Sequence, residues 1–152
     1  MALPLYIFDL DGTLALIEHR RHHVEGDKKD WTAFYKACVN DPPCTAVLQL
    51  AQELHLAGNE VWVWSGRSDE VRDETIEWLT YHLQRVDWVP PVLRMRPAGD
   101  YTPDDRLKMA WYDDLPAHDR DRLVMTFDDR DRMVAAWRAR GVTCAQVAPG
   151  DF

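Results

Sequence analysis

The sequence YIFDLDGTLA, residues 6–15, sets an apolar run directly before two aspartates that are separated by one residue. The run begins at LPLYIF, residues 3–8, and is typical of a short strand buried on both faces. We therefore expect residues 3–8 to form the first and central strand of a sheet. Residues i and i+2 of an extended chain project to the same side, so Asp9 and Asp11 are expected to converge at the end of this strand.

Length and composition indicate one globular domain spanning residues 1–152, with 46% hydrophobic and 29% charged residues. A net charge of −8 disfavours stable nucleic-acid binding, which normally needs a basic surface. Three cysteines without a C-x-x-C pattern favour reduced thiols over disulfides or structural zinc. No apolar run approaches the roughly 20 residues that span a bilayer. We expect a cytoplasmic protein, in a bacterial cell or a phage-infected host, with no membrane association.

The rest of the chain alternates between helix and strand patterns. Apolar residues at helical spacing predict a helix over residues 45–57, capped by Thr45 and ended by Gly58. Residues 60–66 predict a strand and residues 68–86 a helix. The remaining expected elements are a short strand at 91–97, a helix at 104–114, a strand at 122–127, a helix at 130–141 and a strand at 142–148.

This β-α-β-α order predicts an α/β fold of the Rossmann-like kind, a three-layer α/β/α sandwich with a mostly parallel central sheet. Residues 16–43 are polar and end in two prolines, so we interpret them as a small cap or lid inserted after the first strand. Ligands of such sheets bind outside the carboxyl ends of the strands. Functional residues are therefore expected directly after the strands.

Three polar clusters follow the apolar runs, namely Asp9-Leu10-Asp11-Gly12-Thr13, Ser65-Gly66-Arg67 and Asp128-Asp129-Arg130. Two carboxylates held together are costly to ionise unless a cation lies between them. Mg²⁺ prefers carboxylate oxygens and leaves positions open for water and phosphate. Asp128 and Asp129 would complete the coordination begun by the first pair, so the sequence predicts a magnesium site.

These motifs resemble those of the haloacid dehalogenase superfamily. FDLDGTLA, residues 8–15, is similar to the first motif of this superfamily, and VWSGRS, residues 63–68, is similar to the second. FDDRD, residues 127–131, is similar to the fourth motif, and Lys108 on a predicted helix suits the third. Residues 128–152 resemble more narrowly the carboxyl end of the phosphatase domain of phage polynucleotide kinase, and Arg20 lies at that domain's spacing after the first aspartate.

The resemblance implies a role for each matching position. Asp9 would be the nucleophile that forms an aspartyl-phosphate, and Asp11 the general acid and base. Lys108 would supply charge to both reacting groups. The implied substrate-binding residues are Ser65, Gly66, Arg67, Arg20 and Thr13, with Ser65 and the amides that follow it at the opening of a helix. The implied Mg²⁺ ligands are Asp9, Asp11, Asp128 and Asp129.

The expected function is therefore a Mg²⁺-dependent phosphomonoesterase that removes 3′-phosphate from DNA or RNA ends in nucleic-acid repair. The chain has no G-x-x-x-x-G-K-[ST] loop, so transfer of phosphate from ATP is not expected. One alternative is a phosphatase of free nucleotides or another small phosphomonoester, which the negative net charge favours. A catalytically idle binding module is a further alternative, against which the intact set of Asp9, Asp11, Lys108 and Asp128 argues.

Some residues allow an alternative interpretation. Arg106 competes with Lys108 as the cation of its helix. Most of the seven tryptophans are expected in the core. Trp31 and Tyr35, in the predicted lid, are the better candidates for stacking on a nucleobase.

Overall fold

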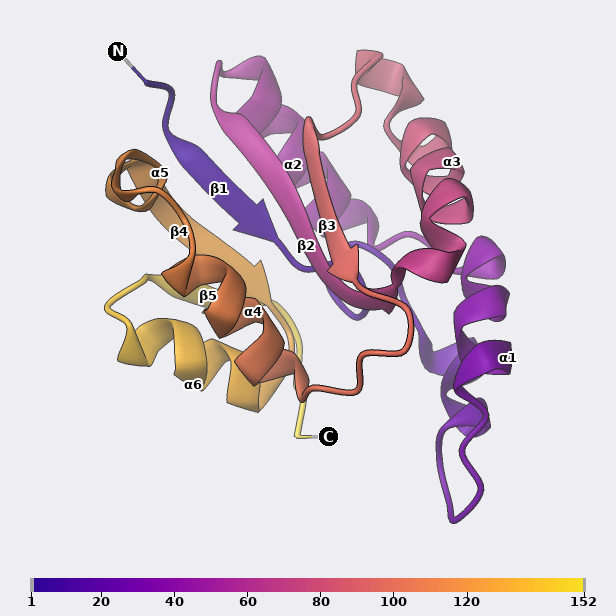
Figure 1. Cartoon of the computed structure of the whole chain (residues 1–152). Coiled ribbons are helices and arrows are strands. Elements are labelled where there is room, and N and C mark those ends of the chain that lie inside the picture. Colours follow the sequence, from indigo (N-terminus) through magenta and orange to yellow (C-terminus); the bar gives the residue numbers. More distant parts are fainter. Residues whose placement is uncertain (1, 152) are drawn as a thin grey trace.

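A computed structural model of the chain describes residues 2–151 and contains a five-stranded parallel sheet in the order β3-β2-β1-β4-β5 (Figure 1). The strands are β1 (Leu5–Phe8), β2 (Glu60–Ser68), β3 (Val92–Arg96), β4 (Leu123–Asp128) and β5 (Cys144–Gln146). The α-helices are α1 (Trp31–Lys36), α2 (Thr45–Leu56), α3 (Arg72–His82), α4 (Asp104–Asp113), α5 (Ala117–Arg122) and α6 (Asp131–Ala139). The predicted α/β architecture and the central place of the first strand are confirmed.

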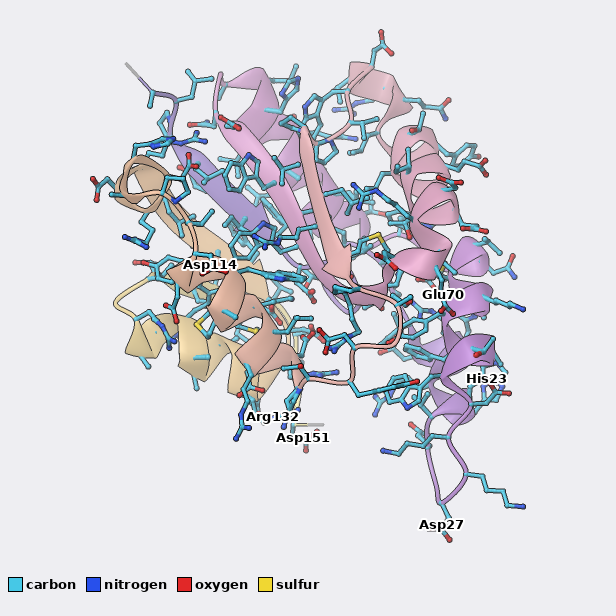
Figure 2. All side chains as sticks on the ribbon, in the orientation of Figure 1. His23, Asp27, Glu70, Asp114, Arg132 and Asp151 are labelled. Carbon is cyan, nitrogen blue, oxygen red and sulfur yellow. The ribbon has the colours of Figure 1, made fainter. Side chains whose placement is uncertain are left out.

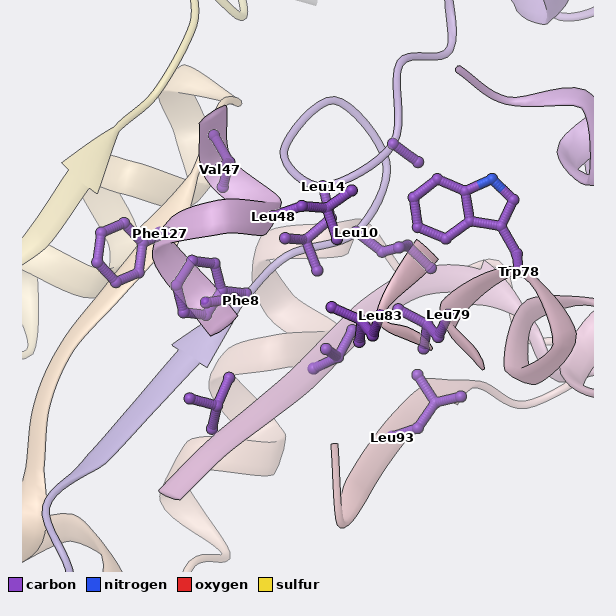
Figure 3. Packing of buried hydrophobic residues seen from close by; sticks show 14 of the residues in the cluster. Phe8, Leu10, Leu14, Val47, Leu48, Trp78, Leu79, Leu83, Leu93 and Phe127 are labelled. Carbon is purple, nitrogen blue, oxygen red and sulfur yellow. The ribbon is translucent and has the colours of Figure 1, made fainter. Parts of the chain in front are cut away.

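The sheet is buried on both faces, as its continuously apolar strands predict. Along β2, Val61 and Val63 pack into one hydrophobic cluster with α2 and α3, whereas Trp62 and Trp64 pack into a second cluster with α4 and α6. Figure 3 shows part of the first cluster, where Phe8 and Phe127 of the neighbouring strands β1 and β4 stack at 4.2 Å between ring centroids. The period-2 alternation of strand side chains thus fills two cores from one sequence run.

Several predicted boundaries differ in the structure. The helix expected over residues 68–86 consists of a 3₁₀ turn η3 (Asp69–Val71), α3, and a second 3₁₀ turn η4 (Gln84–Val86). Thr45 is the first residue of α2 rather than its cap, because Cys44 holds the extended N-cap conformation. The short helix α5 was not predicted, since its sequence AHDRDR has no apolar periodicity.

Residues 16–43, named here the insertion segment, connect β1 to α2 and contain η1 (Glu18–His23), α1 and η2 (Ala37–Asn40). Its two ends are joined by the Leu16 amide, which donates to the Pro42 carbonyl at 2.8 Å. Figure 1 shows α1 at the end of the sheet toward which the strand arrows point. The segment therefore lies beside the strand ends where ligands of parallel sheets bind. Among residues 2–151, no helix is long and apolar enough to cross a membrane.

The α3 layer gives a stability test with a control one turn away. Leu79 is completely buried in the first hydrophobic cluster, whereas Ile76 on the same helix is 38% exposed. We expect Leu79→Ala to lower the free energy of unfolding by about 2–5 kcal/mol, because it removes transfer energy and leaves a cavity. Ile76→Ala should cost less than about 1 kcal/mol. Urea denaturation measures both, and equal losses would contradict the assignment of the core.

Candidate active site

The ends of β1 and β4 bring together acidic side chains around one buried lysine. Lys108, on α4, places its Nζ 2.6 Å from Asp9 Oδ1, 3.2 Å from Asp128 Oδ2 and 3.8 Å from Asp104 Oδ2. Only 1% of the lysine side chain is exposed. Burial alone would lower the pKa of Lys108, but the charges of Asp128 and Asp9 raise it, so the ammonium form is held. Arg106, the competing cation, is exposed on the other side of α4.

Asp9, Asp128 and Asp129 form a buried acidic group in which one carboxylate oxygen of each lies within 4.8 Å of the others. The amides of Asp129 and Arg130 donate to Asp128 Oδ1 at 2.9 and 3.1 Å, which fixes that carboxylate. Burial and the charge of Asp128 raise the pKa of Asp9 well above its usual range and that of Asp129 to about 6. Both pKa values are raised because like charges are held close together and away from water.

The donor set of this group fits a hard divalent cation. The group holds three carboxylates but one lysine, which contacts Asp9 and Asp128, so an excess of negative charge remains in a buried site. Mg²⁺ takes oxygen ligands of this kind and needs only one or two carboxylates together with water and phosphate. Asp9, Asp128 and Asp129 are therefore the residues that could hold the ion.

Asp11, predicted as a partner of Asp9 and as a further metal ligand, is not part of this acidic group. The chain leaves the extended conformation after Phe8, and the Leu10 carbonyl accepts from the amides of Thr13, Leu14 and Ala15 at 2.9–3.1 Å. Gly12, at φ +83°, completes this turn with a backbone that other residues rarely adopt. The i, i+2 rule holds only inside a strand, so the two carboxylates point to different partners.

Those partners are two buried arginines. Asp11 Oδ1 accepts from Arg20 at 2.8 Å and from Arg67 at 2.5 Å. Burial would raise the pKa of Asp11, but the guanidinium charges of Arg67 and Arg20 outweigh it and lower that pKa. The carboxylate of Asp11 is therefore held ionised by the two arginines.

Asp41 is a buried residue of this network that the sequence analysis did not identify. Its two oxygens accept from Nε and Nη2 of Arg20, both at 2.7 Å, and Oδ2 also accepts from Arg67 at 3.0 Å. The remaining guanidinium contacts go to the Phe34 carbonyl and the Thr75 hydroxyl. No sequence signal marks Asp41, because its partners come from η1 and β2, far apart along the chain.

Three other predicted residues have a structural part in the site. The Thr13 hydroxyl donates to Asp9 Oδ2 at 3.3 Å. Ser65 is completely buried and accepts from the Arg67 amide at 3.1 Å, inside β2; the expectation that it opens a helix is wrong, because β2 continues to Ser68. A Cβ on Gly66 would overlap the carboxylate of Asp104, so glycine here permits close approach of α4.

A cavity of about 550 Å³ opens above the acidic group. Its lining includes Asp9, Asp11, Asp128, Asp129 and Arg67, together with aromatic side chains of the insertion segment. Arg20 is fully buried and does not line it. The lining also contains Arg96, Tyr101 and Asp104, which sequence reasoning missed. Arg96 organises the loop between β3 and α4 by donating to the carbonyls of Gly66, Asp100 and Thr102.

Comparison with known families finds a match over nearly the whole chain. Residues 4–152 match the family described as the polynucleotide kinase PNKP phosphatase domain. Two solved structures of the Pnkp1/Rnl/Hen1 complex, one described as an RNA repair complex, contain chains that are 26% and 27% identical to this one, with TM-scores of 0.75 and 0.73. The alignments cover 99% and 100% of this chain but only 44% and 48% of those chains.

More distant structures share the fold. The D,D-heptose 1.7-bisphosphate phosphatase from B. bronchiseptica, described as complexed with magnesium and phosphate, is 16% identical with a TM-score of 0.54 over 93% of this chain and 79% of that one. CbbY from Rhodobacter sphaeroides, in complex with phosphate, is 16% identical with a TM-score of 0.60 over 99% of this chain and 87% of that one.

Gly12 and Gly26 provide a matched test of the acidic group. Both have φ +83°, but a Cβ on Gly12 would overlap the Asp129 carboxylate, whereas nothing lies within 4 Å of one on Gly26. Alanine at either position should cost about 1–2 kcal/mol of stability for the left-handed backbone. We expect Mg²⁺ to raise the melting temperature of the wild-type protein and of Gly26→Ala. It should not raise that of Gly12→Ala, because the new methyl group displaces the Asp129 carboxylate. An equal Mg²⁺ response in both variants would contradict this geometry.

The Asp41 network gives a second test. Asp41→Ala would leave Arg20 and Arg67 with one carboxylate between them in a buried site, so we expect a loss of about 3–5 kcal/mol in unfolding free energy. Asp113→Ala breaks the solvent-exposed pair with Arg140 and should cost less than about 1 kcal/mol. Chemical denaturation of the two variants measures the contrast, and a mild effect at Asp41 would show that the network adds little.

Proposed function

Since the chain belongs to the family of the polynucleotide kinase PNKP phosphatase domain, a HAD-like phosphatase family, we propose that it is a Mg²⁺-dependent phosphomonoesterase that removes 3′-phosphate from polynucleotide ends. One observation carries the proposal. Asp9 lies at the floor of the cavity with one oxygen held by Lys108 and with Asp128 and Asp129 beside it. This arrangement suits attack of a carboxylate on a phosphorus atom.

In the first step, Asp9 would attack phosphorus and the bond from phosphorus to the ester oxygen would break, which gives an aspartyl-phosphate. Asp11 would supply the proton that the leaving oxygen takes up. Lys108 would offset the negative charge that gathers on Asp9 and the transferring group. In the second step, Asp11 would accept a proton from water as that water attacks phosphorus, releasing inorganic phosphate and restoring Asp9. Mg²⁺ held by Asp9, Asp128 and Asp129 would supply positive charge between carboxylates and phosphate.

The buried arginines support a positioning role toward Asp11. Arg20 is completely buried and does not reach the cavity, so the earlier expectation of a direct substrate contact is replaced by a role in holding the Asp11 carboxylate. Arg67 lines the cavity and contacts both Asp11 and Asp41. A phosphate that draws on Arg67 would weaken its hold on Asp11, and so raise the pKa of Asp11 toward the range of a proton donor.

Two observations bear on the substrate. The relatives named above are found in Pnkp1/Rnl/Hen1 complexes, one of them described as an RNA repair complex, which favours a polynucleotide end and a place in nucleic-acid repair. The net charge of −8 favours the second candidate, a phosphatase of free nucleotides. The aligned relatives extend well beyond this chain, so their other activities are not assigned to it.

Phosphate release from four substrates would separate these functions. Protein with Mg²⁺ is offered a 3′-phosphorylated oligonucleotide, a 5′-phosphorylated one, and nucleoside 3′- and 5′-monophosphates. We expect the highest kcat/KM on the 3′-phosphorylated oligonucleotide, and a loss of about 10³-fold or more in Asp9→Asn, which removes the nucleophile. Preference for mononucleotides would replace the polymer-end proposal with the second candidate. Release no greater than that of Asp9→Asn on every substrate would refute a phosphatase.

A further inference from the structure

The cavity is larger than a phosphate group requires. Its volume of about 550 Å³ falls within the roughly 300–1,000 Å³ of pockets that hold small organic ligands. The acidic group occupies its floor, while α1 of the insertion segment contributes Trp31, Phe34 and Tyr35 to its lining. The part of the substrate attached to the phosphate would therefore meet aromatic side chains.

Trp31 and Tyr35 are positioned as a pair. They are separated by one helical turn on α1, and their rings lie 5.9 Å apart with an interplanar angle of 31°. Trp31 also packs edge-on against Phe34 at 5.7 Å, and the Phe34 ring lies under the Arg20 guanidinium at 4.4 Å. Since Arg20 also bonds Asp11, this series of contacts connects the Trp31 ring to the catalytic centre.

The Trp31 ring is held in place yet remains available. The helix that carries it is capped by Asp30, whose side chain accepts from the Ala33 amide at 2.9 Å. In spite of these contacts, Trp31 is 40% exposed where it lines the cavity. A large aromatic surface left open inside a cavity is suited to a planar partner, because every nucleobase has a face that can stack on it.

The charges of the outer cavity suit an anionic chain. Apart from the floor aspartates and Arg67, the lining contains the basic residues Arg21, Lys29, Arg96, Arg130 and Arg132. Three acids, Glu25, Asp100 and Asp104, stand against these five basic residues. Figure 2 shows Arg132 near the start of α6 and His23 on the insertion segment, at the same end of the molecule. The cavity mouth thus carries a local excess of positive charge on a protein whose net charge is −8.

We propose that Trp31 and Tyr35 form a stacking platform for the base of the terminal nucleotide, the one that carries the phosphate attacked by Asp9, at the end of a single-stranded polynucleotide. This inference rests on the proposed function. Stacking of the terminal base would explain why the protein prefers a phosphate that is attached to a nucleotide. Trp31 is the specificity-determining residue of this platform, and the basic mouth attracts the phosphodiester backbone that follows.

The test compares two 3′-phosphorylated oligonucleotides that differ only in the presence of the terminal base. The wild-type protein should prefer the end with a base over the abasic end. In Trp31→Ala the ratio of kcat/KM between the two ends should fall toward one, through a roughly 5- to 100-fold loss on the end with a base. Trp31→Phe, which keeps an aromatic face, should retain most of the ratio. Tyr81→Ala, an exposed aromatic on α3 outside the cavity, should leave it unchanged.

Equal losses on both ends in Trp31→Ala would show that Trp31 only supports the fold of the insertion segment, and an unchanged ratio would show that no stacking occurs; either result overturns the platform. Binding provides a readout independent of turnover. A terminal 2-aminopurine on the 3′-phosphorylated oligonucleotide should be quenched by Asp9→Asn protein and not by Asp9→Asn with Trp31→Ala. If no substrate is hydrolysed, the proposed function fails, but quenching that depends on Trp31 would still support the stacking platform. Absence of that quenching would refute the platform.

Discussion

The ion pair between Lys108 and Asp9 is the interaction on which the site depends. It joins residues 99 positions apart and fixes α4 to the end of β1, while the same ammonium group reaches Asp128 at the end of β4. Without this charge, buried carboxylates from two adjacent strands would face one another with no compensation. The lysine offsets only part of the negative charge, which leaves a buried acidic group that could hold a divalent cation.

The sequence predicted the sheet well because the physical signal was strong. A strand buried on both faces must be apolar throughout, and residues 3–8 and 60–66 therefore stand out from the polar segments around them. The placement of Asp9, Asp128 and Asp129 at one edge followed from the parallel topology, since the carboxyl ends of β1 and β4 meet there. The short helix α5 and the break between η3 and α3 carry no comparable pattern.

The surroundings of Asp11 could not be predicted in the same way. Rules for the spacing of side chains hold within a regular element, and the chain turns at Leu10 to Ala15 immediately after β1. Asp41 then depends on tertiary contacts alone, because it pairs with Arg20 of η1 and Arg67 of β2. The two halves of the site thus differ in origin: strand ends gather the acids, whereas the charges that hold Asp11 come from Arg20 of the insertion segment and Arg67 of β2.

The central position of β1 has a consequence for the order of folding. Its partners are β2, which begins at Glu60, and β4, which begins at Leu123, so both pairings close long loops. Contacts at such separation slow folding because the chain entropy of loop closure is lost before they form. During synthesis from the amino terminus, β1 emerges first and yet keeps one edge unpaired until β4 is made. Asp9 at its end is thus made before its partners Lys108 and Asp128, and it reaches its final environment only after both have been made.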